Sequence, residues 1–218
     1  MHQSTPRSVT SAIALLLLLF SLMRSTTEAY SLIFYSEGDT NCHFNTDHIG
    51  CYEHPAGTCC HSHAPFCDRL MLGLNTSYPS QKFTQYFMHQ SQCRLSAGAS
   101  YCTQGGPDES AQCCIPLPTA RADIDNTTCS GFWLNGVTGA SPPGWKAEAE
   151  KEAGDCMDPN YLSYNDGLEV RKIYLPHGTL QQALDAYKDK NFSALAMFKT
   201  LTEVYGNDTG MVSGTNLA

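Results

Sequence analysis

The chain has 218 residues, and its 21 aspartates and glutamates outnumber its 13 lysines and arginines, which gives a formal net charge of −8. No cluster of lysine or arginine occurs along the sequence, so binding to nucleic acid or to an anionic membrane surface is not expected. The length has room for one domain or two small ones, and the chain carries 11 cysteines.

Residues 1–29 are predicted to be a secretory signal peptide. An apolar run over residues 12–23 follows a weakly positive start, and Ala29 ends a polar segment with a small residue where a signal peptidase cleaves. The run is short for a transmembrane span, and a single anchoring helix is the alternative. We therefore expect a secreted, extracellular protein that begins near Tyr30, whose cysteines form disulfides in an oxidising compartment.

Residues 30–135 are predicted to form a cysteine-rich module in which one pattern occurs twice, over about 32–74 and 83–134. Each half has an aromatic opening, two cysteines separated by eight residues, a vicinal cysteine pair, and a last cysteine three residues before an apolar triplet. The cysteines are Cys42, Cys51, Cys59, Cys60 and Cys67 in the first half, and Cys93, Cys102, Cys113, Cys114 and Cys129 in the second. An internal repeat of this kind indicates two halves of related architecture.

Short strands are expected over residues 31–35, 67–74, 82–88 and 129–134, because these segments are apolar, aromatic or β-branched. Residues 41–58 contain glycine, proline and several histidines and are predicted to be turn-rich. Many short strands between turns favour a small sandwich or barrel, so the module is predicted to be β-rich.

Residues 136–218 are predicted to be a linker followed by a small helical extension, which makes the whole chain α+β. The linker covers residues 136–144, a short helix 145–153, and a strand 168–175. Thr179 and Gln182 have the spacing of a capping box, and Asn191 is expected to cap a second helix. The second helix would place on one face Leu195, Phe198, Leu201 and Tyr205. Both helices are expected to cover the β-module or to pair with each other.

Each vicinal pair is expected to tie down two segments, because adjacent cysteines on a strand point to opposite faces. The simplest pairing keeps each doublet within its own half, bonded to the first two cysteines there, with the individual partners left open. Cys67 and Cys129 occupy equivalent positions and are expected to meet at a pseudo-two-fold axis. Cys156 is then the odd cysteine; alternatively, Cys156 bonds Cys129 and leaves Cys67 free.

Two further sets of candidate residues stand out. Asn-x-Ser/Thr acceptors for glycosylation occur at Asn75, Asn126, Asn191 and Asn207. His61 and His63 lie on the same face of an extended segment, with His54 nearby in sequence, and could chelate copper or zinc. The other interpretation of these histidines is a solvated loop that changes charge near neutral pH.

The paired halves resemble the double Greek key of βγ-crystallin-type domains. The resemblance lies in the Phe34-Tyr35-Ser36-Glu37 opening and in the apolar closing strand. The sequence from Asp125 through Ser130 is similar to the calcium loop of that family, which implies a calcium ligand at Asp125. In overall style the chain also resembles secreted, cysteine-rich fungal proteins of the effector and killer-toxin kind. Its cysteine order is similar to that of hydrophobins, which the internal repeat explains more simply.

No catalytic signature occurs: the sequence has no Gly-x-Ser-x-Gly elbow, no His-Glu-x-x-His helix and no phosphate-binding glycine loop. We therefore expect a non-catalytic, glycosylated binding protein, effector-, toxin- or wall-associated in kind, with an extracellular protein or glycan as its target. One alternative is a secreted hydrolase that uses an acidic pair such as Asp123/Asp125 or Asp155/Asp158. The other is a histidine-rich secreted protein that binds a metal. No cofactor is expected beyond copper, zinc or calcium at these candidate residues.

Overall fold

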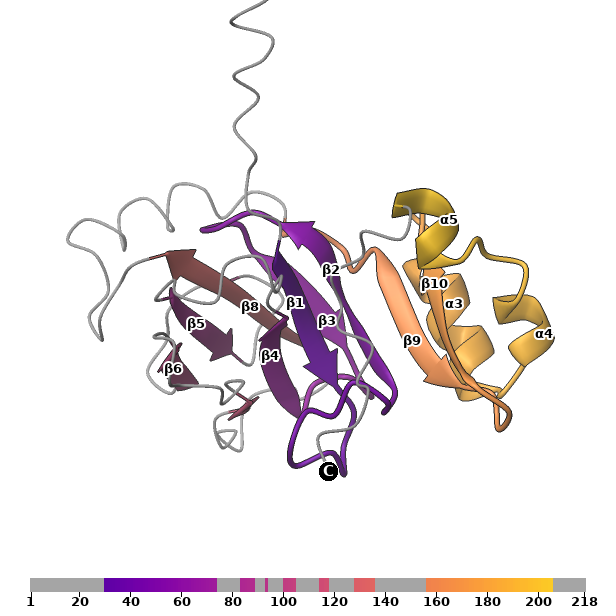
Figure 1. The fold of residues 1–218 in the computed structure, drawn as a ribbon, viewed down its shortest axis with the longest axis horizontal. Helices are drawn as coiled ribbons and strands as arrows, with labels where there is room; N and C mark the ends of the chain where they lie inside the picture. The colour runs from indigo at the N-terminus through magenta and orange to yellow at the C-terminus, as the bar shows by residue number, and fades with distance from the viewer. Residues whose placement is uncertain are drawn as a thin grey trace, which may run out of the picture.

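The computed structural model describes residues 30–73, 83–88, 93, 100–104, 114–117, 128–135 and 156–205. The described chain is β-rich, with ten strands in two antiparallel sheets and three short helices near its C-terminal end (Figure 1). The predicted signal peptide, the linker 136–144 and the predicted helix 145–153 lie outside the described residues.

The first sheet is built around β1 (Tyr30–Tyr35), which pairs with β2 (His48–His54) on one side and with β4 (Arg69–Gly73) on the other. Every residue of β1 is buried, because both faces of this strand are covered. Apart from Ser31, the strand is aromatic or aliphatic, as a strand buried on both faces requires. The strands predicted over residues 31–35 and 67–74 are thereby confirmed as β1 and β4.

The turn-rich interpretation of residues 41–58 is wrong for its middle, where β2 forms a strand of seven residues. Both ends of β2 are histidines, and His48 and His54 are each fully buried. A polar residue at each end of a strand hides the period-2 apolar pattern on which a sequence-based strand prediction rests.

The second sheet is built around β5 (Phe83–Met88), between β6 (Ser100–Gln104) and β8 (Thr128–Asn135). The remaining strand of each half pairs with the sheet of the other half. β3 (Cys60–His63) pairs with β8, and β7 (Ile115–Pro116) pairs with β4. The two sheets therefore exchange one strand in each direction.

Large aromatic side chains fill the space between the two sheets. The ring centroids of Tyr30 and Trp133 lie 4.5 Å apart, and those of Phe34 and Phe87 lie 5.9 Å apart. Each contact joins a β1 residue to a residue of the second sheet, so aromatic burial holds the sheets together. The sheets pack closely at Gly131, where an added Cβ would lie 2.8 Å from Leu70 Cδ2.

The extension adds two strands to the first sheet, one of which the sequence did not predict. The expected strand over residues 168–175 is confirmed as β10 (Val170–Tyr174). β10 pairs with β9 (Tyr161–Asn165), and β9 pairs with β2, so the sheet order is β10-β9-β2-β1-β4-β7. The three helices lie beside these added strands (Figure 1). They are α3 (Leu180–Lys188), α4 (Phe192–Leu195) and α5 (Leu201–Tyr205).

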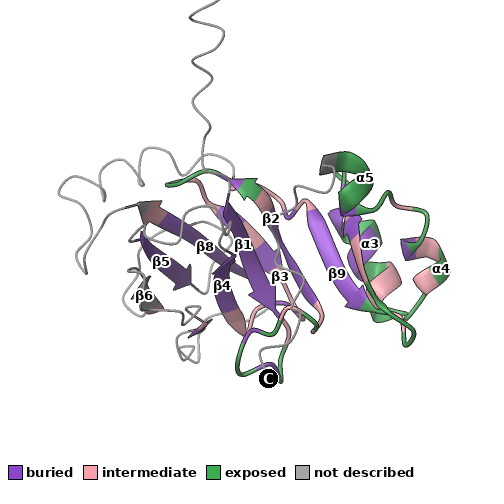
Figure 2. Ribbon diagram, viewed as in Figure 1, coloured by how far each residue is buried: buried purple, intermediate pink, exposed green. Residues whose placement is uncertain are grey.

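The apolar side of α3 joins the core through Leu180, Ala183 and Leu184, which belong to the same buried cluster as Ile173 of β10. The outer sides of the helices are exposed (Figure 2). The predicted helices therefore cover the strands of the extension.

Two details of the predicted helices are wrong. The capping box of α3 does not form, because the Thr179 hydroxyl donates to the carbonyl oxygen of Pro176 at 2.6 Å. The second predicted helix is divided into α4 and α5. The Tyr174 amide donates to the Lys199 carbonyl oxygen at 2.8 Å, so the chain between the helices pairs with β10 and leaves the helical path.

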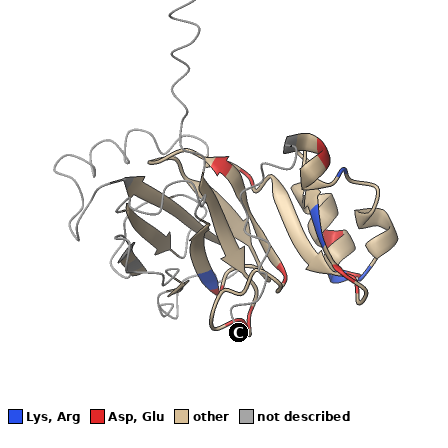
Figure 3. Cartoon of the chain, viewed as in Figure 1, with Lys and Arg blue, Asp and Glu red and all other residues tan. Residues whose placement is uncertain are grey.

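Charged side chains gather at strand ends and on the extension (Figure 3). Within the described part of residues 30–135, Arg69 is the one lysine or arginine. The acidic residues in the same part are Glu37, Asp39, Asp47, Glu53 and Asp68. The described surface of the β-module, residues 30–135, is therefore acidic.

Candidate functional site

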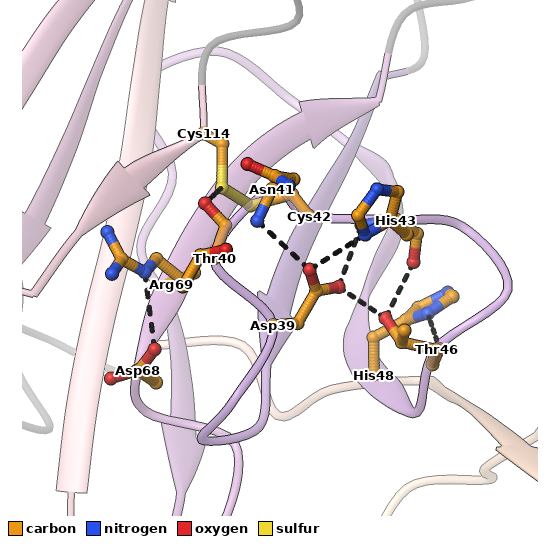
Figure 4. A network of polar contacts seen from close by, with 10 residues as sticks. All are labelled: Asp39, Thr40, Asn41, Cys42, His43, Thr46, His48, Asp68, Arg69 and Cys114. Carbon is orange, nitrogen blue, oxygen red and sulfur yellow. Dashed lines mark hydrogen bonds and ion pairs between the residues drawn. A yellow bond between two sulfur atoms is a disulfide. The ribbon is translucent and has the colours of Figure 1, made fainter.

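The β1–β2 loop is organised around the buried carboxylate of Asp39 (Figure 4). The backbone amides of Asn41 and His43 donate to its two oxygens at 3.0 and 2.7 Å, and the Thr46 hydroxyl donates to Oδ2. The ring Nδ1 of His43 lies 3.1 Å from Oδ1. Among the described residues Asp39 is the one buried acidic group. The contacts above satisfy the hydrogen-bond acceptors of its two oxygens.

Burial alone would raise the pKa of Asp39, but the hydrogen bonds from Thr46, Asn41 and His43 outweigh it and hold the pKa below its ordinary value. The carboxylate is therefore ionised, and it fixes the loop that carries Cys42 to its disulfide partner Cys114. Its chemistry is that of a structural acceptor in a loop.

The predicted metal-binding histidines lie on β3. His61 and His63 are both half-buried on the same side of the strand, as the sequence indicated, and their ring centroids lie 5.3 Å apart. The Nε2 atom of His61 lies 2.9 Å from Asp158 Oδ1, so this imidazole pairs with a carboxylate of the extension. Burial, and then the neighbouring His61, lowers the pKa of His63 below its ordinary value.

Two groups of three ligand atoms from histidine, cysteine or carboxylate converge within 4.8 Å in the described chain, and neither contains His61 or His63. A copper or zinc site at these two histidines stays a prediction. Asp125, the predicted calcium ligand, lies outside the described residues.

His54 does not lie with the other two histidines. It is buried beside Cys51 and Cys60, and burial lowers its pKa to about 4. The sulfur atoms of Cys51 and Cys60 are bonded to each other, so neither offers the thiolate that a metal ion requires. In this arrangement His54 is a neutral core residue.

The disulfides of the described chain join residues from 9 to 97 positions apart in the sequence. Three pairs have one partner each: Cys42–Cys114, Cys51–Cys60 and Cys67–Cys129. The expected meeting of Cys67 with Cys129 is confirmed, and so is a bond from the first doublet to Cys51. Cys102 is also disulfide-bonded, and Cys113 lies outside the described residues.

The expectation that each doublet bonds within its own half is wrong for the other pairs. Cys114 bonds Cys42 of the first half, and Cys59 reaches Cys93 of the second half. The physical reason is the strand exchange, because β3 and β7 carry the ends of the doublets into the sheet of the opposite half.

One sulfur atom has two partners. Cys59 is placed to form a disulfide with either Cys93 or Cys156, because the three sulfurs all lie within 4.8 Å of one another. We call Cys59, Cys93 and Cys156 the three-sulfur cluster. All three residues are half-buried, so solvent reaches them. A divalent sulfur forms one disulfide, so one of the two outer cysteines is a thiol whenever the other is bonded.

Backbone hydrogen bonds place Cys156 in the cluster. The amide of Met157 donates to the Cys59 carbonyl oxygen at 2.8 Å, and the amide of His61 donates to the Met157 carbonyl oxygen at 3.1 Å. These bonds hold Met157 beside the end of β3, and the pair of His61 with Asp158 supports the same contact through side chains. No local sequence signal connects segments so far apart.

Asn191, a predicted glycosylation site, is exposed and caps α4. Its Oδ1 accepts the Ala194 amide at 3.2 Å and the Ser193 hydroxyl at 2.8 Å. A glycan attaches through Nδ2, so capping and glycosylation use different atoms of the same side chain. The other three acceptors, Asn75, Asn126 and Asn207, lie outside the described residues.

The turn between β9 and β10 presents an apolar side chain to solvent. Leu168 is 91% exposed, although its turn is closely hydrogen-bonded. Asp166 Oδ1 accepts the amides of Leu168 and Glu169 at 2.9 and 3.0 Å, and Asp166 also pairs with Arg171. The Arg171 hydrogen bond, followed by these amides, lowers the pKa of Asp166 to about 2.

Comparison with known proteins gives no match, whether the chain is compared with protein-family models, with curated proteins or with solved structures. In the part of the chain that the structure describes, no helix has the length and apolar character needed to cross a membrane.

Proposed function

We propose that the protein is a secreted, glycosylated, disulfide-braced binding protein that acts without catalysis on an extracellular protein or glycan. The observation that carries the proposal is the disulfide framework. Cys42–Cys114 and Cys67–Cys129 join residues 72 and 62 positions apart, and both bonds cross between the halves of the β-module. Bonds of this kind persist in oxidising compartments outside the cytosol.

We also propose that the β-module is a duplicated Greek key of the βγ-crystallin type. In each half the fourth strand lies beside the first, β4 beside β1 and β8 beside β5, as a Greek key requires. The crossed bonds Cys42–Cys114 and Cys59–Cys93 each join the first cysteine of one half to the doublet of the other, at the second doublet position in one bond and the first in the other. A crystal structure in which the halves superpose, with Cys42 over Cys93, supports this; halves that do not superpose refute it.

The β9–β10 turn is the proposed contact with the target. A turn fixed by hydrogen bonds loses little conformational entropy when it binds, so an exposed Leu168 contributes its apolar area at low entropic cost. Asn165 strengthens the arrangement, because its amide donates to Asp47 Oδ1 at 2.8 Å and ties the turn to the β1–β2 loop.

The test uses the full chain secreted from a eukaryotic host, applied to glycan arrays and to intact cells with or without protease treatment. We expect saturable binding that Leu168→Asp weakens at least about tenfold, since a charge replaces a buried apolar contact. Met197→Asp is the matched control, because Met197 is 86% exposed on a different loop. Absence of saturable binding to every surface refutes the function, and equal effects of the two substitutions refute the assignment of the turn.

A further inference from the structure

The three-sulfur cluster is the one place in the described chain where more sulfur atoms meet than a disulfide can use. The chain has 11 cysteines, an odd number, so at least one cannot belong to an intrachain disulfide. The structure places the surplus sulfur against a bonded pair and not alone on the surface. A thiol next to a disulfide is the arrangement from which exchange proceeds.

We propose that the three-sulfur cluster is an internal thiol–disulfide exchange site, in which Cys59 passes its single disulfide between Cys93 and Cys156. The covalent bond on Cys59 then has two positions. In one it joins the two halves of the β-module, and in the other it joins the β-module to the extension.

The exchange is balanced and needs no oxidant or reductant. The Cys156 thiol loses its proton to solvent, and the thiolate attacks Cys59 Sγ. The new Cys59–Cys156 bond forms while the Cys59–Cys93 bond breaks, and the electron pair of the broken bond leaves on Cys93 Sγ, which takes a proton from solvent. One disulfide and one thiol are present before and after the step.

The backbone accommodates both bonds. The Cα atoms of Cys59 and Cys93 lie 5.6 Å apart, and those of Cys59 and Cys156 lie 4.6 Å apart. Both distances fall within the range of about 4.4–6.8 Å found in disulfides, so exchange moves side chains and leaves the strands in place. The thiol form of Cys93 also has a hydrogen-bond acceptor, because its Sγ lies 3.2 Å from the Gly131 carbonyl oxygen.

Different contacts favour each position. The Cys59–Cys93 bond joins the first cysteine of the second half to the doublet of the first half, as Cys42–Cys114 does in the opposite direction, so it completes the crossed framework of the β-module. The Cys59–Cys156 bond is favoured by the backbone hydrogen bonds of Met157 with Cys59 and His61 and by the pair of His61 with Asp158. A ligand or surface that pulls the extension away from β3 would therefore drive the bond to Cys93.

Three cysteines could instead hold a zinc or copper(I) ion as thiolates. That arrangement requires all three sulfurs to be reduced, whereas the other described cysteines are all disulfide-bonded. The exchange proposal and the metal alternative differ in the number of free thiols, which is one for exchange and three for a metal site.

The experiment maps the free thiol in the full-length secreted chain. The protein is equilibrated near neutral pH with a trace of reduced glutathione, quenched in acid and denatured. N-ethylmaleimide then labels free thiols, and the remaining cysteines are reduced and labelled with iodoacetamide before proteolysis and mass spectrometry. We expect one maleimide per chain, divided between Cys93 and Cys156, and none on Cys59.

Two pairs of variants sharpen the result. Cys93→Ser and Cys156→Ser should each fold with Cys59 bonded to the remaining partner and carry no maleimide. Asp158→Asn weakens the contact with His61 and should move the label toward Cys156 by roughly twofold to fivefold. Asp185→Asn is its matched control, because this carboxylate accepts a hydrogen bond from Gln181 on the exposed side of α3. It should leave the division of label between Cys93 and Cys156 unchanged.

Three outcomes overturn the proposal. The first is a label confined to one cysteine under every equilibration condition. The second is a label on a cysteine outside the cluster or a covalent dimer with no free thiol. The third is three labelled thiols together with one bound zinc or copper ion per chain, which would establish the metal site.

Discussion

Acid should destabilise this protein well above the pH at which carboxylates protonate, because two histidines are buried in neutral form. Burial lowers the pKa of His48 to about 3 and that of His54 to about 4. The Nδ1 atom of His48 is 2.7 Å from the Thr46 carbonyl oxygen, to which it donates, whereas Nε2 is buried and has no partner. A proton on Nε2 would therefore place a charge in the core without an acceptor.

The direction of this pH effect on stability follows from the number of protons that the folded and unfolded states bind. A histidine in the unfolded chain has a pKa of about 6.5, so below that pH the unfolded state binds more protons than the folded state. Stability is fully present above about pH 6.5 and is lost as the pH falls toward the folded pKa values. From about pH 7 to about pH 5, each histidine removes about 2 kcal/mol, or about 4 kcal/mol together.

Urea unfolding followed by tryptophan fluorescence at the two pH values measures this loss, since Trp133 is buried between the sheets. His48→Gln and His54→Gln should each remove a similar share of the pH dependence and the double variant most of it, with the half-buried His63 contributing to the remainder. His177→Gln, at an exposed position, should leave the dependence as in the unmodified protein. A double variant with the full dependence would refute the reasoning.

Three further predictions concern stability. Replacing Cys67 and Cys129 together with alanine should lower the free energy of unfolding by about 4 kcal/mol in guanidinium titration, because the bond closes a long loop; a loss below about 1 kcal/mol would contradict this. Gly50→Ala should cost about 3 kcal/mol in thermal unfolding, since its Cβ would overlap the Leu32 carbonyl oxygen, and an unchanged melting temperature would show that the strands have room. Asn191→Gln should remove both a glycan and a helix cap at a cost of about 1 kcal/mol, whereas Asn191→Asp should remove the glycan alone; equal losses measured by chemical unfolding would argue against the cap.

The sequence predicts those strands whose own residues are mostly apolar, because such residues are buried in any fold. β1 and β5 are mainly aromatic and apolar, and the repeated cysteine spacing predicts that they are equivalent strands of two related halves. β2 was missed because His48 and His54 are polar residues that tertiary structure buries. The division of the second helix was missed because it results from pairing of Lys199 with Tyr174, a contact between separate segments.

The sequence predicted which residues matter in the candidate site, but it did not predict which of them come together. The histidine spacing on β3 and the importance of the cysteine doublets could be read directly from the sequence. The partners of the doublets could not, because they depend on which sheet receives β3 and β7. Cys156 was set apart as the odd cysteine, but its place beside Cys59 follows from the hydrogen bonds of Met157 with the end of β3.

The strand exchange between the sheets has a consequence for how the chain matures. While the N-terminal half emerges during synthesis, β3 has no edge to join until residues 128–135 have followed it. During that interval Cys59 and Cys67 lack their native partners and lie close in sequence to other reactive sulfurs. Early mispaired bonds are the natural result, so we expect efficient maturation to depend on a disulfide isomerase, and an isolated N-terminal half to be trapped in scrambled forms.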